Sequence, residues 1–178
     1  MMRVAMTTAA LAITLAGCGS AAGSIAPGAL GVSARDAYAE ARTSARVWSS
    51  TARLRWVEGQ GIDAGGVAIP GDGLWRFHFT APEKRDELVV QIQALQSSME
   101  ERAPTSPPGI IIGDRALDNA WVDSRVAMDA VVEAHTGAMP ASVSMLLVPT
   151  RTEQWIIRAP ESEATWHIHA GTGEVLQP

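Results

Sequence analysis

The most constraining feature of this chain is a pattern of one helix followed by several strands, which occurs twice. In residues 33–48, alanine, tyrosine and tryptophan recur at helical spacing, and Ser33 is placed to cap the helix. From residue 52 the period changes to two, the spacing of a strand with one buried face. The same order returns after residue 123. The sequence therefore predicts an α+β fold with two repeated units, each a helix packed on a three-to-four-stranded antiparallel sheet.

Several short segments carry the strand pattern, and their large apolar residues are expected on the face that packs against the helices. The predicted strands are 52–57, 74–80, 87–93, 142–148, 153–158 and 165–170. Four tryptophans fall at inward positions of these strands: Trp56, Trp75, Trp155 and Trp166. Because polar turns separate the strands, each sheet is expected to leave its other face in solvent.

The stretches between the patterned segments set the expected domain boundaries. We predict the first unit over residues 33–95 and the second over residues 123–178. Residues 96–122 hold serines and prolines with charges between them, which is typical of a linker. Residues 18–32 are mostly small and uncharged, so we expect a flexible tether there.

The first residues have the pattern of an export signal. Arg3 is followed by an apolar and small-residue run that ends in Leu15-Ala16-Gly17-Cys18. The run is shorter than the roughly 20 apolar residues that a membrane-spanning helix needs. The segment is similar to a bacterial lipoprotein signal, which is cut before the cysteine. That resemblance implies a signal peptide over residues 1–17 and a lipid on Cys18; the alternative is an ordinary signal peptide with an incidental cysteine.

Composition excludes several classes of function. Cys18 is the only cysteine, so neither an internal disulfide nor a cysteine zinc site is expected. A formal net charge of −5 gives no general attraction for nucleic acid. The chain has no phosphate-binding loop, nucleophile elbow or metalloprotease helix motif, and its carboxylates are scattered. We therefore expect no cofactor and no enzymatic activity.

Three stretches of the second half resemble the PepSY family: Trp121-Val122-Asp123-Ser124, Gln154-Trp155-Ile156-Ile157, and the closing segment from Trp166 to Val175. Residues 33–95 resemble a degenerate copy that lacks the closing Thr-Gly-Glu turn. The resemblance implies short α+β, cystatin-like units of envelope proteins and protease propeptides. It also implies protein binding or protease inhibition in place of catalysis.

Five polar side chains form the candidate binding surface: Arg76, His78, Arg158, His167 and His169. Each is expected on the solvated face of its strand, where joining of the two sheets would give a partly cationic surface for an acidic partner segment. His167 and His169 also have a spacing that can hold a metal, with His78 or a carboxylate as third ligand. We favour the solvated-face interpretation and predict no metal site.

The sequence thus predicts a non-enzymatic, lipid-anchored protein of the cell envelope that binds a protein partner, with an envelope protease as the candidate. The membrane is contacted through the lipid on Cys18. Gly19 and not aspartate follows Cys18, and the resemblance to lipoproteins then implies the outer membrane in a Gram-negative cell, and otherwise the outer face of the plasma membrane. The alternative is an extracytoplasmic lipoprotein that binds a small ligand in a pocket between helix and sheet.

Overall fold

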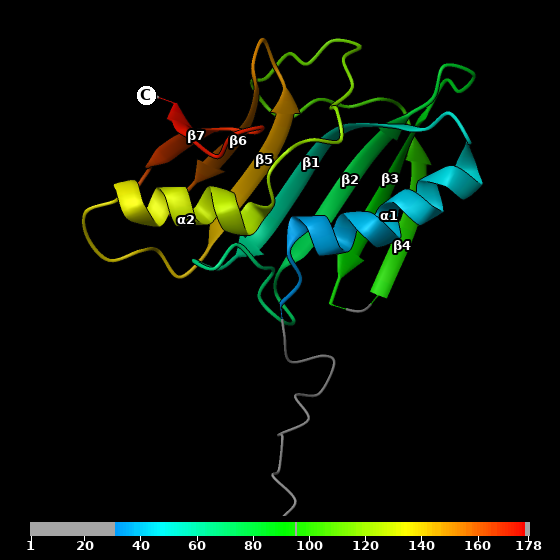
Figure 1. The fold of residues 1–178 in the computed structure, drawn as a ribbon. Helices are drawn as coiled ribbons and strands as arrows, with labels where there is room; N and C mark the ends of the chain where they lie inside the picture. The colour runs from blue at the N-terminus through cyan, green and yellow to red at the C-terminus, as the bar shows by residue number, and fades with distance from the viewer. Residues whose placement is uncertain (1–30, 95, 177–178) are drawn as a thin grey trace, which may run out of the picture.

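The computed structural model describes residues 31–94 and 96–176, which form one antiparallel sheet with two helices on one face (Figure 1). The helices are α1 (Ala34–Trp48) and α2 (Ser124–Ala134). The strands are β1 (Arg53–Ile62), β2 (Leu74–Thr80), β3 (Glu87–Gln93), β4 (Gln96–Arg102), β5 (Val143–Pro149), β6 (Glu153–Arg158), β7 (Thr165–His169) and β8 (Val175–Leu176). Cys18 and the predicted signal peptide lie outside the described residues.

The two halves of the sheet join through β1 and β5, giving the strand order β4-β3-β2-β1-β5-β6-β7-β8. At this junction Val57 lies opposite Leu147, and Glu58 lies opposite Leu146. The predicted α+β class is confirmed, and the strands of the two predicted units form one continuous sheet. One helix on three or four strands buries little apolar surface, and joining the strands enlarges the shared core.

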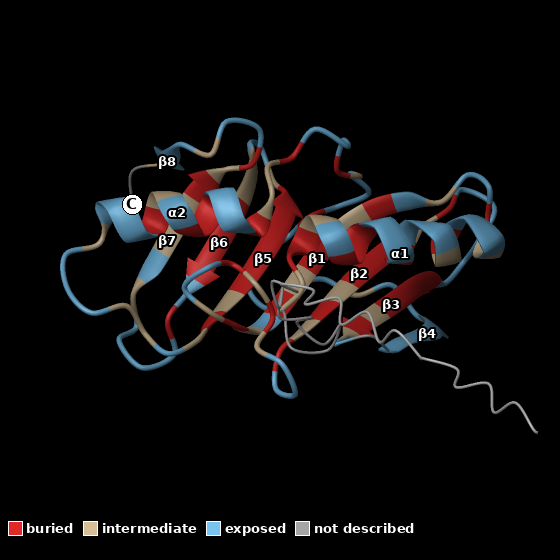
Figure 2. Cartoon of the chain, turned by 60° about the horizontal axis from the view of Figure 1, so that its bottom comes forward, coloured by how far each residue is buried: buried red, intermediate tan, exposed pale blue. Residues whose placement is uncertain are grey.

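The main core lies between the helices and the sheet face that they cover, which we call the helix-side face (Figure 2). Trp75, Trp121 and Trp155 are fully buried there. The Trp155 ring meets the other two edge-on, with centroid distances of 6.2 Å to Trp75 and 5.8 Å to Trp121. Trp75 and Trp155 thus face the helices as predicted, and Trp166 packs against the same core while partly buried.

The segments that enter the helices are tied to these tryptophans. Trp75 Nε1 donates to the carbonyl of Val32 (2.8 Å), and Trp155 Nε1 donates to the carbonyl of Val122 (3.0 Å). The Val32 carbonyl also accepts from the amide of Ala68 (3.0 Å). The described chain therefore enters the folded body at the Val32 carbonyl, which is hydrogen-bonded to the indole of the core residue Trp75.

The two helices begin at one shared point. Ser33 and Asp123 are the N-caps, and the role of Ser33 agrees with the sequence prediction. Asp123 Oδ1 also accepts from the Arg35 amide of α1 (3.0 Å). The buried Ser124 hydroxyl accepts from the Ala34 amide (2.9 Å) and donates to the Gly66 carbonyl (2.6 Å). Side chains of the second half thereby satisfy free amides at the start of the first helix.

The predicted linker 96–122 begins with a strand. Residues 96–102 form β4, which pairs with β3 along its whole length and lies at the edge of the sheet. Both of its faces are largely exposed, so its sequence shows no apolar alternation. The remainder, which we call the covering segment (residues 103–118), packs Ile110 and Ile112 on the sheet face opposite the helices and returns to the helix-side core at Leu117.

The prediction that Trp56 faces the helices is wrong. The pairing register shifts between Leu54 and Trp56, so that Leu54 opposes Phe79 and Trp56 opposes His78. Such a bulge adds one residue to a strand and moves the following side chain to the other face. Trp56 therefore joins a second apolar cluster on the face opposite the helices, with Leu146, Val148, Ile156 and Ile112 of the covering segment.

Candidate functional site

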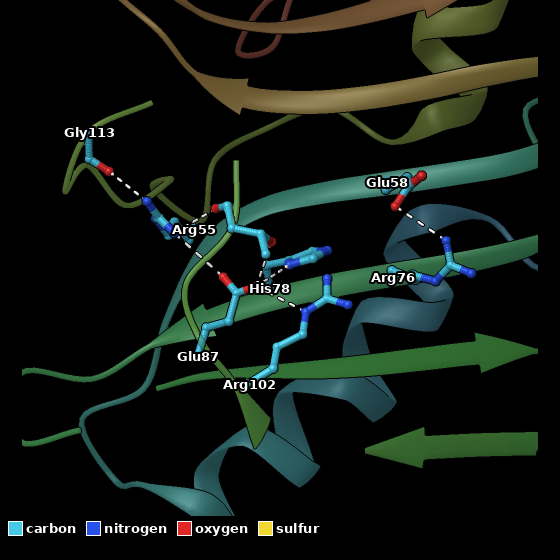
Figure 3. A network of polar contacts seen from close by, with 8 residues as sticks. Arg55, Glu58, Arg76, His78, Glu87, Arg102 and Gly113 are labelled. Carbon is cyan, nitrogen blue, oxygen red and sulfur yellow. Dashed lines mark hydrogen bonds and ion pairs between the residues drawn. The ribbon is translucent and has the colours of Figure 1, made fainter. Parts of the chain in front are cut away.

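A closed polar network lies beneath the covering segment (Figure 3). The side chains of His78 on β2 and Glu87 on β3 are fully buried, with 3.1 Å between Nδ1 and Oε1. Arg55 NH1 lies 3.5 Å from Glu87 Oε2, and Arg102 Nε lies 3.4 Å from Oε1. The Thr105 hydroxyl donates to Oε1 at 2.7 Å. The buried negative charge of Glu87 is thus compensated by hydrogen bonds and by two arginine cations.

Arg55 extends the network into the covering segment. Its guanidinium donates to the carbonyl of Thr105 (2.8 Å) and to the carbonyl of Gly113 (3.1 Å). A planar fork of donors can hold a carboxylate and two carbonyls at once. The network therefore fastens the covering segment to β1, β2 and β3.

The buried position sets the charge states of the pair. Burial lowers the pKa of His78 below its ordinary value, although the hydrogen bond and the charge of Glu87 act against this. Burial alone would raise the pKa of Glu87, but hydrogen bonds from His78 and Thr105 outweigh it and keep the pKa below its ordinary value. At neutral pH, Glu87 is ionised, and the neutral His78 ring donates from Nδ1.

The sequence placed His78 on a solvated face, and this prediction is wrong. The His78 side chain is fully buried, because Trp56 stacks on it and the covering segment closes over that part of the sheet. His78 Nε2 and Trp56 Nε1 have no hydrogen-bond partner in the described chain. The His78–Glu87 pair at the centre of the network is thus closed off from solvent, whereas the Arg102 side chain at its rim is partly exposed.

The other predicted site residues are spread over the face opposite the helices. Arg76 is half-buried and bonds Gln91 and Glu58 within the first half. In the cross-strand row that contains it, Glu58, Leu146 and Ile156 separate Arg76 from His167. Four strand spacings of about 4.8 Å put these two residues roughly 19 Å apart. The five predicted residues therefore do not form one site.

The remaining histidines have local structural partners. His167 Nδ1 lies 3.1 Å from Gln154 Oε1. His169 Nδ1 accepts from the amides of Gly171 and Thr172, each at 3.1 Å, and so orders the turn after β7. In the described part of the chain, no three His, Cys, Asp or Glu side chains gather in a way that could hold a metal ion.

The structure offers two accessible features whose lining residues the sequence did not indicate as site residues. One is the edge strand β4, where Met99 is 60% exposed. The other is a hollow of about 290 Å³ between α1 and the sheet, lined in part by arginines. The sequence held two signals for this network. Glu87 begins the strand that pairs with the strand of His78. The apolar run Ile110-Ile111-Ile112 lay in the predicted linker, outside any predicted core.

Neither described helix is long and apolar enough to cross a membrane. A scan against known protein families gives no match to this chain, and a search among curated proteins gives none either. The fold is similar to a crystal structure described as "a putative lipoprotein" from Clostridium difficile 630, with a TM-score of 0.53. The two chains are 14% identical, and the match covers 79% of this chain and 90% of the other. This likeness shows a shared fold, and the PepSY resemblance stays a prediction.

Proposed function

We propose that this chain is a lipid-anchored protein of the cell envelope that binds another protein and catalyses no reaction. The Leu15-Ala16-Gly17-Cys18 box supports the anchor, and the fold shared with a protein described as a lipoprotein agrees with it. The anchored chain would lie on the outer membrane of a Gram-negative cell or on the outer face of a plasma membrane.

The single observation that carries protein binding is the open edge of the sheet. β4 pairs with β3 on one side, and no described strand pairs with its other side. An edge strand presents free backbone donors and acceptors, so an extended segment of a partner can add to the sheet there. β4 is seven residues long and largely exposed, which gives such a segment room to pair.

The side chains of β4 indicate the chemistry of the added segment. Met99 lies in register with the core residue Val90, so it extends the apolar helix-side face to the edge. Glu100 and Glu101 point to opposite faces, and basic residues beside them would be favourable cross-strand neighbours. We therefore expect an extended partner segment with one apolar residue and flanking basic residues.

The PepSY resemblance extends the proposal to an envelope protease as the partner and to two related units within the chain. The order of one helix and four strands occurs twice, which supports related units. So do the matched hydrogen bonds of Trp75 and Trp155, each to the carbonyl directly before an N-cap residue.

Replacement of the cysteine tests the anchor. The wild-type chain should fractionate with membranes, and mass spectrometry should find acyl groups on Cys18. Cys18→Ser should lose that added mass and leave the membrane fraction. A wild-type chain without acyl groups would overturn the anchor and leave the edge-strand proposal standing.

Charge reversal on β4 tests the partner surface. Glu100→Lys/Glu101→Lys should lose a specific protein that the wild-type chain retains from detergent-solubilised envelopes, as measured by quantitative mass spectrometry. Glu133→Lys/Glu161→Lys makes the same change in net charge at exposed positions elsewhere and should retain it. Equal recovery by both variants would contradict binding at β4. A retained protease whose cleavage rate changes on addition of the chain would support the protease partner.

A further inference from the structure

The hollow beside α1 lies between the C-terminal half of the helix and the adjoining ends of β1 and β2. Its floor includes the buried side chains of Leu54 and Phe79. Arg42, Arg46 and Arg53 line it as well and are exposed. Its volume of about 290 Å³ is close to the lower end of the range for small-ligand sites, roughly 300–1,000 Å³. The small-ligand alternative from the sequence expected a cavity in this kind of position.

The guanidinium groups of these three arginines make no hydrogen bond or ion pair with any described residue. Their neighbours do: Arg35 donates to the carbonyls of Asn119 and Trp121, and Arg55 bonds Glu87. No carboxylate lines the hollow. Three like charges around one hollow repel each other, so a bound anion would be stabilised by all three.

Tyr38 lines the same hollow and contributes no negative charge to it. Its hydroxyl donates to Asn119 Oδ1 at 2.9 Å. Burial raises the pKa of Tyr38, and the charges of Arg42, Arg35 and Arg46 offset this only in part. The phenol therefore stays protonated at neutral pH and adds no negative charge to the hollow.

A second hollow on the other side of Arg53 is a weaker candidate. It is lined by Arg55 and Lys84, but Asp114 lines it too. Arg55 is already bonded to Glu87 and to the carbonyls of Thr105 and Gly113. The positive charge around this second hollow is thus compensated within the chain, whereas the positive charge around the hollow beside α1 is not.

We infer that the hollow beside α1 binds a small organic phosphate, that is, a phosphate group carried on a short apolar or aromatic body. Guanidinium groups match phosphate oxygens with paired hydrogen bonds, and three cations suit a dianion better than a single carboxylate. Leu54 and Phe79 are already buried, so the gain comes from the ligand, whose own apolar surface would leave water by lying on this floor. A soluble phosphate ester and a phospholipid headgroup share this chemistry. The inference goes beyond the edge-strand proposal and is independent of it.

Calorimetric titration of the full chain in a neutral, non-ionic detergent tests the inference. Phenyl phosphate should bind saturably and more tightly than inorganic phosphate, and phenol should not bind. Arg42→Gln/Arg46→Gln should weaken phenyl phosphate binding about tenfold or more, because two charged donors are lost. Arg85→Gln/Arg151→Gln removes the same net charge at exposed positions outside the hollow and should leave the affinity unchanged.

The thermal midpoint of each variant checks that it is folded, which the exposure of the replaced side chains favours. An absence of saturable binding, or equal losses in both double variants, would overturn the inference. Equal affinity for phenyl phosphate and inorganic phosphate would overturn the part assigned to the apolar floor. Addition of phosphatidylglycerol to the detergent distinguishes the sources: competition identifies a membrane headgroup as the occupant, and unchanged binding identifies a soluble phosphate ester.

Discussion

Trp56 lies flat against His78, with ring centroids 3.5 Å apart and ring planes 16° apart. Both rings occupy the sheet face opposite the helices, because a bulge in β1 turns Trp56 to that face. Trp56 covers one face of the His78 ring, and Glu87 is hydrogen-bonded to its Nδ1. This combination keeps an uncharged histidine and an ionised glutamate in contact inside the fold.

The pair makes stability fall on acidification in two stages. The folded-state pKa of His78 is lowered below its ordinary value of 6.5, so the unfolded chain takes up a proton there first. That contribution is present above pH 6.5 and is lost as the pH falls toward the folded pKa. Glu87 has a folded pKa below 4.5 and adds a second loss at lower pH. Urea unfolding between pH 7.5 and 5 should show the first stage.

Replacement of His78 isolates that first stage. In His78→Gln the dependence of the unfolding free energy on pH should be shallower between pH 6.5 and 5, because the lowered pKa of His78 is gone. The comparison is one of slopes, so a variant that is less stable at every pH remains informative. Parallel curves for wild type and variant would show that His78 does not titrate differently in the folded chain.

Loss of the Glu87 carboxylate should destabilise the fold. Glu87→Ala leaves Arg55 and His78 without their buried partner, and breaking such a pair costs about 3–5 kcal/mol. Urea unfolding at pH 7 measures the change. Glu161→Ala removes an exposed carboxylate and should stay within about 0.5 kcal/mol of wild type. A Glu87→Ala midpoint equal to that of this control would refute the role given to the network.

An added methyl group at Gly59 should strain the central strand. A Cβ there would lie 2.3 Å from Trp75 Cζ3, a fully buried ring in the helix-side core. Gly59→Ala should therefore cost about 1–3 kcal/mol, the usual price of overpacking. Gly65→Ala is the control, because the nearest atom to its Cβ is Asp63 Oδ1 at 3.3 Å. Similar thermal midpoints for the two variants would contradict the close packing of Trp75 on Gly59.

Removal of the Ser124 hydroxyl should destabilise the N-terminus of α1, the helix of the first half. Ser124→Ala leaves the Ala34 amide and the Gly66 carbonyl without their buried partner, at a cost of about 1–3 kcal/mol. Hydrogen exchange at the Ala34 amide should accelerate as well. Ser162→Ala, at an exposed position, should change neither quantity. Unchanged exchange at Ala34 in the Ser124 variant would count against coupling of the two halves at this point.

The sequence predicted the elements well where one periodicity dominates. Residues 34–48 follow a helical stripe from a capping serine, and Trp75, Phe77 and Phe79 alternate without interruption, so both segments have the predicted faces. β4 was missed because Met99 and its neighbours are exposed on both faces and leave no alternating pattern. Periodicity records burial, so an edge strand with little burial gives no signal.

The candidate site was less predictable, because it depends on contacts between distant segments. The alternation of Arg76 and His78 is real, but Ile110 and Ile112 of the covering segment make one end of that face interior. The bulge at Arg55 depends on pairing with β2 and cannot be read from the residues of β1 alone. Arg42, Arg46 and Arg53 are exposed, and only the packing of α1 on the sheet brings them around one hollow.

The double hydrogen bond at the Val32 carbonyl has a mechanical consequence. In a chain held at Cys18, any pull from the membrane enters the folded body at this residue. The carbonyl transmits the load to Ala68 and to the Trp75 ring, which contacts Trp155 across the junction of the two halves. Tension on the proposed anchor would therefore be resisted by the centre of the core. β4 is separated from β2 by β3, so it lies outside this path.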